Sequence, residues 1–255
     1  MRSSSGDVVS VPVMGLHFMK RPGYTAKDYV RDGLVAMWDG VENAGWGTHD
    51  PNATTWKDLV GGKEMPNRVP FDNYTCLSIN AAASYCSMPA VTSDMTMTTT
   101  LRTTDTISWH LYNFLSYGTN SFNSQGFTLC SGDDQSGGKF VAYYRDGYGS
   151  SHRIVRFLLG VSPASEHNLV MSFVYSTKTI SCYVDGVFIG DGQIPDDKYV
   201  SGTGVLNFGS NVVNAGELSE STGYRQYNIL LYNRALTAEE IAANYKIDKR
   251  RFNLP

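Results

Sequence analysis

The side chains best suited to catalysing hydrolysis form three pairs of adjacent carboxylates: Asp133-Asp134, Asp196-Asp197 and Glu239-Glu240. Glycoside hydrolysis requires two carboxyl groups about 5 to 9.5 Å apart around one bond. Adjacent residues on a strand point to opposite faces, and the first two pairs lie in polar segments near Gly or Pro. These pairs therefore predict no catalytic site, and a glycoside hydrolase would need carboxylates that are distant in the sequence.

Other catalytic patterns do not occur in the chain. There is no G-x-S-x-G elbow, no P-loop and no H-E-x-x-H motif. The five histidines are scattered along the sequence: His17, His49, His110, His152 and His167. We therefore expect a protein that is not an enzyme.

Binding of carbohydrate needs aromatic platforms beside polar groups, because sugar rings have apolar faces and hydroxyl edges. Aromatic and polar residues lie closest together in the sequence at Tyr144, Arg145, Asp146 and Tyr148, which are the candidate ligand-binding residues. Alternation along a strand buries one residue of each neighbouring pair, so about half of such a segment faces a ligand.

No cofactor is expected from the metal-ligating residues. Asp50-Pro-Asn52 and Asp133-Asp134-Gln135 offer oxygen ligands for calcium, but neither forms a dense acidic loop. The four cysteines lack the C-x-x-C spacing of a zinc site; they are Cys76, Cys86, Cys130 and Cys182. They are predicted to be small buried residues, although Cys76 and Cys86 would bond across a hairpin in an oxidising compartment.

Composition and charge limit the classes of partner. The chain of 255 residues has a net charge of -3 and is rich in Tyr, Phe, Thr, Val and Gly, which favours a single all-β domain. The acidic balance provides no field to attract nucleic acid or an anionic membrane. The sequence contains no run of 18 apolar residues, so no transmembrane helix is predicted. The N-terminus lacks the apolar core of a secretory signal.

Short runs of strand-forming residues, separated by Gly, Ser, Asn and Asp, repeat from residue 75 onward. Residues 95–103 alternate Met or Leu with Thr, which predicts one buried face and one solvated face. Asp185-Gly186 predicts a type I′ hairpin turn. Only the C-terminus is predicted to be helical, because Thr237 and Glu240 form a capping box and Lys246, Lys249, Arg250 and Arg251 suit the negative end of the helix dipole.

Residues 1–23 are interpreted as an extended N-terminal arm, ahead of one domain at 24–255. Val8, Val9, Val11 and Val13 favour a strand, while Pro12 and Pro22 restrict pairing to an edge. Because extended arms often mediate assembly, we expect the arm to contact neighbouring virion or surface proteins, within an oligomer or lattice.

Four segments resemble the laminin G-like branch of the concanavalin A-like lectin and glucanase superfamily. They are Asp32–Gly40, the W-x-D-L-x-G element Trp56–Gly62, the strand pair His167–Gly186 that ends in Y-V-D-G, and the Y-N-R-A-L-T-x-x-E-I motif Tyr232–Ile241. The resemblance implies a two-sheet antiparallel jelly-roll sandwich with a short C-terminal helix. We also expect Arg234 to pair with an acidic loop residue such as Asp39 or Asp58.

The E-x-D-x-E strand of the superfamily's glucanases is missing from this chain. The resemblance therefore implies a non-catalytic binding or structural module. The first hypothesis is a phage or virion surface component, such as a capsid decoration or a tail-fibre adhesion protein, that recognises glycans. The alternatives are a secreted bacterial carbohydrate-binding module and a glycoside hydrolase with a non-obvious carboxylate pair. A virion or an extracellular surface is the expected location.

Overall fold

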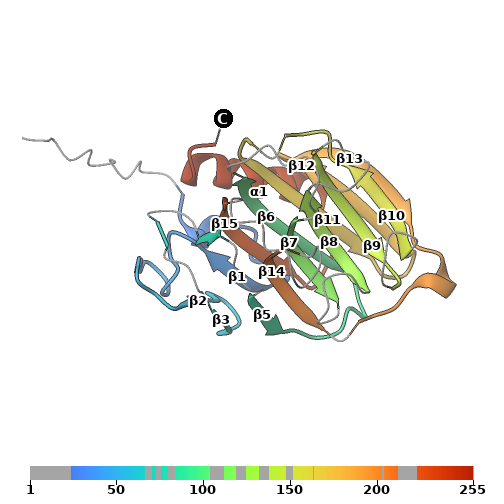
Figure 1. Ribbon diagram of the computed structural model, residues 1–255, viewed down its shortest axis with the longest axis horizontal. Coiled ribbons are helices and arrows are strands. Elements are labelled where there is room, and N and C mark those ends of the chain that lie inside the picture. Colours follow the sequence, from blue (N-terminus) through green and yellow to red (C-terminus); the bar gives the residue numbers. More distant parts are fainter. Residues whose placement is uncertain are drawn as a thin grey trace, which may run out of the picture.

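The computed structural model describes residues 24–66, 71–72, 76–79, 84–103, 112–118, 125–131, 138–147, 152–162, 164–202, 204–211 and 223–254. The predicted N-terminal arm lies outside these residues, as do Tyr148 and the 133–135 calcium candidate. Over the described part the chain is an all-β antiparallel sandwich with one C-terminal helix, as the sequence predicts (Figure 1).

Two large sheets form the layers of the sandwich (Figure 1). The seven-stranded sheet has the order β1-β15-β6-β11-β12-β13, with β4 also pairing with β15. Its strands are β1 (Leu34–Asp39), β4 (Cys76–Ile79), β6 (Met95–Thr103), β11 (His167–Val174), β12 (Thr179–Val184), β13 (Val187–Gln193) and β15 (Gly223–Tyr232).

The six-stranded sheet has the order β10-β9-β8-β7-β14-β5. Its strands are β5 (Ser84–Ser87), β7 (Tyr112–Gly118), β8 (Gly126–Ser131), β9 (Phe140–Arg145), β10 (Arg153–Leu158) and β14 (Val205–Asn211). A small third sheet pairs β2 (Thr55–Lys57) with β3 (Glu64–Pro66), and two 3-10 turns, η1 (Ala26–Asp28) and η3 (Asp196–Lys198), complete the set with helix α1 (Ala238–Arg251).

The main core fills the space between the two large sheets, where apolar side chains from both inner faces meet. A second cluster lies on the other face of the seven-stranded sheet, beneath α1 and η1; it includes Tyr29, Met37, Leu230, Ile241 and Ile247. The threonine face of β6 is therefore not solvated, contrary to the prediction from its alternation. Thr96, Thr98 and Thr100 are buried because α1 covers that side of the sheet.

Hydrogen bonds to Asp248 of α1 take the place of hydrogen bonds to water for polar side chains on this covered face. The carboxylate of Asp248, on the buried side of α1, accepts hydrogen bonds from Thr100 Oγ1 at 2.5 Å, Asn228 Nδ2 at 2.8 Å and Asn168 Nδ2 at 2.9 Å, and from the Tyr29 hydroxyl. Since buried polar groups are costly when unpaired, this network fixes α1 in one position on the sheet.

The motifs that carry the family resemblance have structural roles. Asp58 accepts backbone N–H bonds from Met37, Val60 and Gly61 at 2.8 to 3.0 Å, and Trp56 Nε1 donates to the Asp39 carbonyl at 2.9 Å. These bonds fasten the segment after residue 55 to β1. Such contacts explain the residue types of the W-x-D-L-x-G element without assigning it any chemistry.

Two turn and cap predictions are confirmed. Asp185 and Gly186 both have positive φ, 53° and 76°, as a type I′ turn requires. Thr237 Oγ1 accepts from Glu240 N, and the Glu240 carboxylate accepts from Thr237 N, so the capping box starts α1 as predicted.

Arg234 pairs with an acidic loop residue as predicted, but with Asp32 and not with Asp39 or Asp58, and the predicted contact between Cys76 and Cys86 is wrong. Arg234 pairs with Glu240, at 2.6 and 2.7 Å, and with Asp32 at 2.9 Å, because the turn after β15 lies beside the N-terminus of α1. Cys76 and Cys86 do not face each other across a hairpin. Their strands β4 and β5 pair with β15 and β14 in different sheets, and Cys86 is a free, buried thiol.

Candidate functional site

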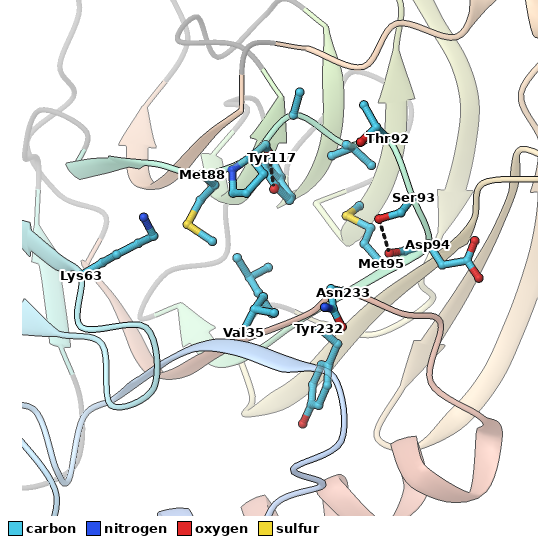
Figure 2. A pocket seen from close by; sticks show the side chains of 14 residues that line it. Val35, Lys63, Met88, Thr92, Ser93, Asp94, Met95, Tyr117, Tyr232 and Asn233 are labelled. Carbon is cyan, nitrogen blue, oxygen red and sulfur yellow. Dashed lines mark hydrogen bonds between the residues drawn. The ribbon is translucent and has the colours of Figure 1, made fainter.

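A cavity of about 410 Å³ opens at the rim of the sandwich, where the chain passes from β5 in one sheet to β6 in the other (Figure 2). Its walls come from that connection, from β1, from the end of β7, from Lys63 and from the turn after β15. Pockets of 300 to 1,000 Å³ are the usual size for small-molecule sites, so the cavity is the candidate binding site.

The connection at 88–94 is held along its length by polar bonds. Met88 N donates to Gly204 O at 2.6 Å, and Val91 N donates to Ser201 O at 3.1 Å. The hydroxyl of Tyr117 donates to Pro89 O at 2.5 Å, and that of Tyr199 donates to Val91 O. Because both flanks are bonded, this wall of the cavity is held in one position.

Val35 projects into the cavity from β1 (Figure 2). The pairing of β1 with β15 shifts register between Leu34 and Ala36, so Val35 occupies a β-bulge on an edge strand. Bulges re-aim a side chain away from the sheet's alternation, which explains why this valine is 37% exposed between buried neighbours.

The remaining lining combines an apolar wall with a few polar groups. Met88, Met95 and Leu231 are buried apolar residues, whereas the polar lining comprises Lys63, Thr92, Ser93, Asp94 and Asn233. Apolar surface beside hydroxyl, amide and amine groups suits a ligand with an apolar face and polar edges.

Two lining side chains are directed elsewhere. The Asp94 carboxylate accepts from Tyr175 N at 2.8 Å and points away from the cavity (Figure 2). The Tyr232 ring points toward α1, where its hydroxyl accepts from Asn244 Nδ2 at 2.9 Å (Figure 2). The cavity therefore presents Lys63 as its charged side chain among the described lining residues.

Two weakly acidic groups beside the cavity, the Tyr117 hydroxyl and the Cys86 thiol, are held neutral by burial. Burial raises the pKa of Tyr117 to about 12, and the neighbouring Cys86 adds to this effect. Burial likewise raises the pKa of the Cys86 thiol to about 11. Because the thiolate is the reactive form of cysteine, Cys86 is a packing residue rather than a nucleophile at neutral pH.

The residues that the sequence singled out for ligand binding lie elsewhere. Tyr144 is buried on the inner face of β9, where its ring lies 5.1 Å from that of Phe127 and its hydroxyl accepts from Val200 N at 2.6 Å. Arg145 is also buried, with its guanidinium 4.6 Å from the Tyr143 ring.

Both faces of β9 are covered, so the exposed positions expected for Tyr144 and Arg145 are corrected to buried ones. Asp146 is half-buried and pairs with His152 at 2.8 Å and with Lys198 at 3.7 Å. Tyr148 lies outside the described residues. The structure thus brings none of the described candidates to the cavity.

The cavity itself gave no signal in the sequence. Its lining comes from residues 35, 63, 88–95, 117 and 231–233, which meet only after folding. Two segments of the family resemblance contribute to the lining, since Val35 belongs to Asp32–Gly40 and Asn233 to the Y-N-R-A-L-T motif, but neither segment indicated a cavity.

The carboxylate pairs give no catalytic arrangement within the described residues. Glu239 and Glu240 lie in the first turn of α1, where Glu240 binds Arg234, and Asp196 and Asp197 lie on η3. Within the same residues no group of three or more His, Cys, Asp or Glu side chains is arranged to hold a metal ion. Asp50 instead accepts from Asn52 N at 2.8 Å in a local turn.

None of the helices in the described ranges has the length and apolar character needed to cross a bilayer. Comparison of the sequence with protein-family models and with curated proteins finds no match. Many solved structures share the fold.

A sialidase of Trypanosoma rangeli, in complex with 2,3-difluorosialic acid, superposes with a TM-score of 0.60 at 14% identity, covering 86% of this chain and 33% of that one. The botulinum neurotoxin serotype D binding domain gives a TM-score of 0.60 at 14% identity, covering 84% and 52%. The ligand binding domain of the same serotype, in complex with N-acetylneuraminic acid, gives 0.61 at 13% identity, covering 84% and 51%.

This chain thus spans about a third to a half of the length of these structures. At such low identity the comparisons establish the fold alone, an all-β sandwich of the same kind.

Proposed function

We propose that this chain is a non-catalytic carbohydrate-binding domain of the laminin G-like, concanavalin A-like type, and that the rim cavity holds the saccharide. The observation that carries the proposal is the cavity, whose lining combines the apolar side chains of Val35, Met88 and Met95 with the polar side chains of Lys63 and Asn233. A sugar ring offers the matching surfaces, since its C–H face is apolar and its rim carries hydroxyl groups.

Fold-level support comes from the structural neighbours, because the neurotoxin domain and the sialidase are both described in complex with sialic acids. The non-catalytic assignment is supported by the lining, whose one carboxylate among the described residues is bonded to Tyr175 N. The finer setting, a phage or virion surface component that uses an N-terminal arm at 1–23 to contact its neighbours, rests on the sequence alone.

The cavity is tested by filling it. Val35→Trp places a large side chain in the cavity from an exposed bulge, so the fold should tolerate it, and we expect saccharide binding to fall at least about tenfold. The assay is a glycan array, followed by calorimetry on the best ligand. Val187→Trp is the matched control, because Val187 is a 64% exposed valine on β13, outside the cavity.

Several outcomes would overturn the proposal. Absence of any saccharide binding by the unaltered chain removes the function, and equal affinity of Val35→Trp and the unaltered chain removes the site. Turnover of a polysaccharide panel that Asp94→Asn abolishes would favour the hydrolase instead. The virion setting fails if mass spectrometry of purified particles does not detect the chain.

A further inference from the structure

Two exposed aromatic rings, outside the cavity, lie beside cations that form no ion pair with any described residue. Trp46 is 37% exposed, with Lys27 Nζ 5.7 Å and the Arg31 guanidinium 5.2 Å from its ring centre. Tyr24 is 39% exposed, with the Arg250 guanidinium 5.2 Å from its ring. These aromatic–cation pairs join η1, the loop at 42–48 and the end of α1 into one surface, which we call the η1–α1 surface.

The loop that carries Trp46 is fixed by a buried carboxylate. Glu42 accepts from Gly47 N at 2.8 Å with one oxygen and from Ala26 N at 3.2 Å with the other. Gly45 and Thr48 also form a bridge that turns the loop tip. Because Glu42 bonds the loop and η1 together, Trp46 and the cations of the η1 segment keep a defined spacing.

Helix α1 supplies the other cations of the surface. Lys246, Lys249 and Arg250 are exposed, and positions three and four apart lie on the same side of a helix. Asp248, the acidic residue among them, is turned into the buried network and does not neutralise them at the surface. The adjacent Arg251 is buried against Asp39.

Five cations of this surface make no ion pair with any described residue: Lys27, Arg31, Lys246, Lys249 and Arg250. Two exposed carboxylates lie in the same region, and neither is bonded to one of these five cations. Asp28 accepts the capping bonds of Thr25, and Asp32 pairs with Arg234. In a chain of net charge -3, this surface is therefore a local concentration of positive charge beside exposed rings.

We propose that the η1–α1 surface binds an acidic polysaccharide, a chain of sugar rings bearing carboxylate or sulfate groups. The exposed parts of Trp46 and Tyr24 would contact the C–H faces of sugar rings. The cations of η1 and α1 would pair with the anionic substituents, which a neutral saccharide does not offer. This site is separate from the rim cavity and does not depend on it.

Nucleic acid is the rival polyanion, since bases also stack on aromatic rings. Its affinity depends mainly on a basic field along a densely charged backbone, with about one charge per 1.7 Å of duplex. The net charge of -3 opposes that long-range attraction, whereas the short-range contacts of five cations and two rings suit a polymer whose repeating unit is a sugar ring with an anionic substituent.

The test uses the full chain and four probes: polygalacturonate, dextran sulfate, neutral dextran and single-stranded poly(dT). We expect polygalacturonate and dextran sulfate to bind, with affinity that falls as salt rises, and Val35→Trp, in which the rim cavity is filled, not to bind dextran. Lys27→Ala/Arg31→Ala and Trp46→Ala should each weaken binding about tenfold or more. All of these side chains are exposed, so thermal unfolding should change little.

The matched control is Lys139→Ala/Lys198→Ala, which removes the same charge from residues outside this surface. An equal loss in the control variant would show non-specific attraction and overturn the site. Equal binding of neutral dextran and polygalacturonate by Val35→Trp, tighter binding of poly(dT), or no binding of either acidic polymer would overturn the ligand class. Val35→Trp should leave polygalacturonate binding unchanged, so failure here and failure of the cavity proposal are distinguishable.

Discussion

The ion pair between Arg251 and Asp39 allows a sharp test of how the C-terminal helix is held. Arg251 donates to the two oxygens of Asp39 at 2.5 and 3.0 Å, and the side chains are 4% and 0% exposed. The same guanidinium lies 3.2 Å from the Tyr29 hydroxyl and 3.4 Å from Glu42. One cation thus contacts two buried carboxylates, those of Asp39 and Glu42.

Arg251→Ala leaves Asp39 buried with only the backbone N–H bonds of Val41 and Glu42, at 3.0 Å each. Removing one partner of a buried pair costs about 3–5 kcal/mol, because the remaining charge is uncompensated. Typical domains have about 5–15 kcal/mol of stability, so the variant should still fold. We expect the free energy of unfolding to fall by about 3–5 kcal/mol.

The assay is urea unfolding followed by fluorescence of the buried Trp38 and Trp56, with the slope m unchanged. Arg250→Ala is the control, since this neighbour is exposed and its loss should cost less than about 0.5 kcal/mol. The double variant Asp39→Asn/Arg251→Met should lose less than Arg251→Ala, because it buries no lone charge. A loss of stability below about 1 kcal/mol for Arg251→Ala, or a loss in the double variant as large as that in Arg251→Ala, would refute the reasoning.

The remaining predictions concern pH and one glycine. Burial raises the pKa of Asp248 to about 6, above the value of 3.8 in the unfolded chain. The folded state therefore keeps the proton of this carboxyl group to a higher pH than the unfolded state does. The stability that this group contributes is lost as pH rises from about 4 to about 6. The contribution of Asp248 to the free energy of unfolding should change by about 3 kcal/mol over that range. The difference in unfolding free energy between the unaltered chain and Asp248→Asn should therefore vary with pH, and a constant difference would contradict the prediction. Gly204 has a φ of +70°, and a Cβ there would lie 2.0 Å from Met88 O, so Gly204→Ala should displace the cavity wall, weaken saccharide binding and destabilise the chain by more than 2 kcal/mol. Gly62→Ala is the control, with the same φ and no atom within 4 Å, and calorimetry and thermal unfolding that fail to separate the two variants would contradict the prediction.

Local signals in the sequence predicted local structure well. The limits of β6, Met95–Thr103, follow from its period of two, and the Asp185-Gly186 turn and the Thr237 cap are formed as predicted. In each case the interacting groups are within a few residues of one another, so the chain specifies them before any tertiary contact forms.

Predictions of which side chains are exposed were less reliable. The threonine face of β6 has the pattern of a solvated face, but α1 covers it, and the polar side chains bond to Asp248 instead of water. Tyr144 and Arg145 have the composition of a sugar site, but both faces of β9 are buried. Residue type reports what a side chain is able to do, whereas accessibility depends on which elements pack over it.

The absence of catalytic activity, which the sequence analysis predicts, stays a proposal. Its support comes from the missing catalytic motifs and from the cavity lining. The sequence by itself determined the all-β class, the strand and turn positions and the start of the helix, because these depend on periodicity and capping within short segments. Only the tertiary structure decided where the two proposed binding sites form. The rim cavity and the η1–α1 surface each combine residues more than a hundred positions apart, and no local pattern encodes such a meeting.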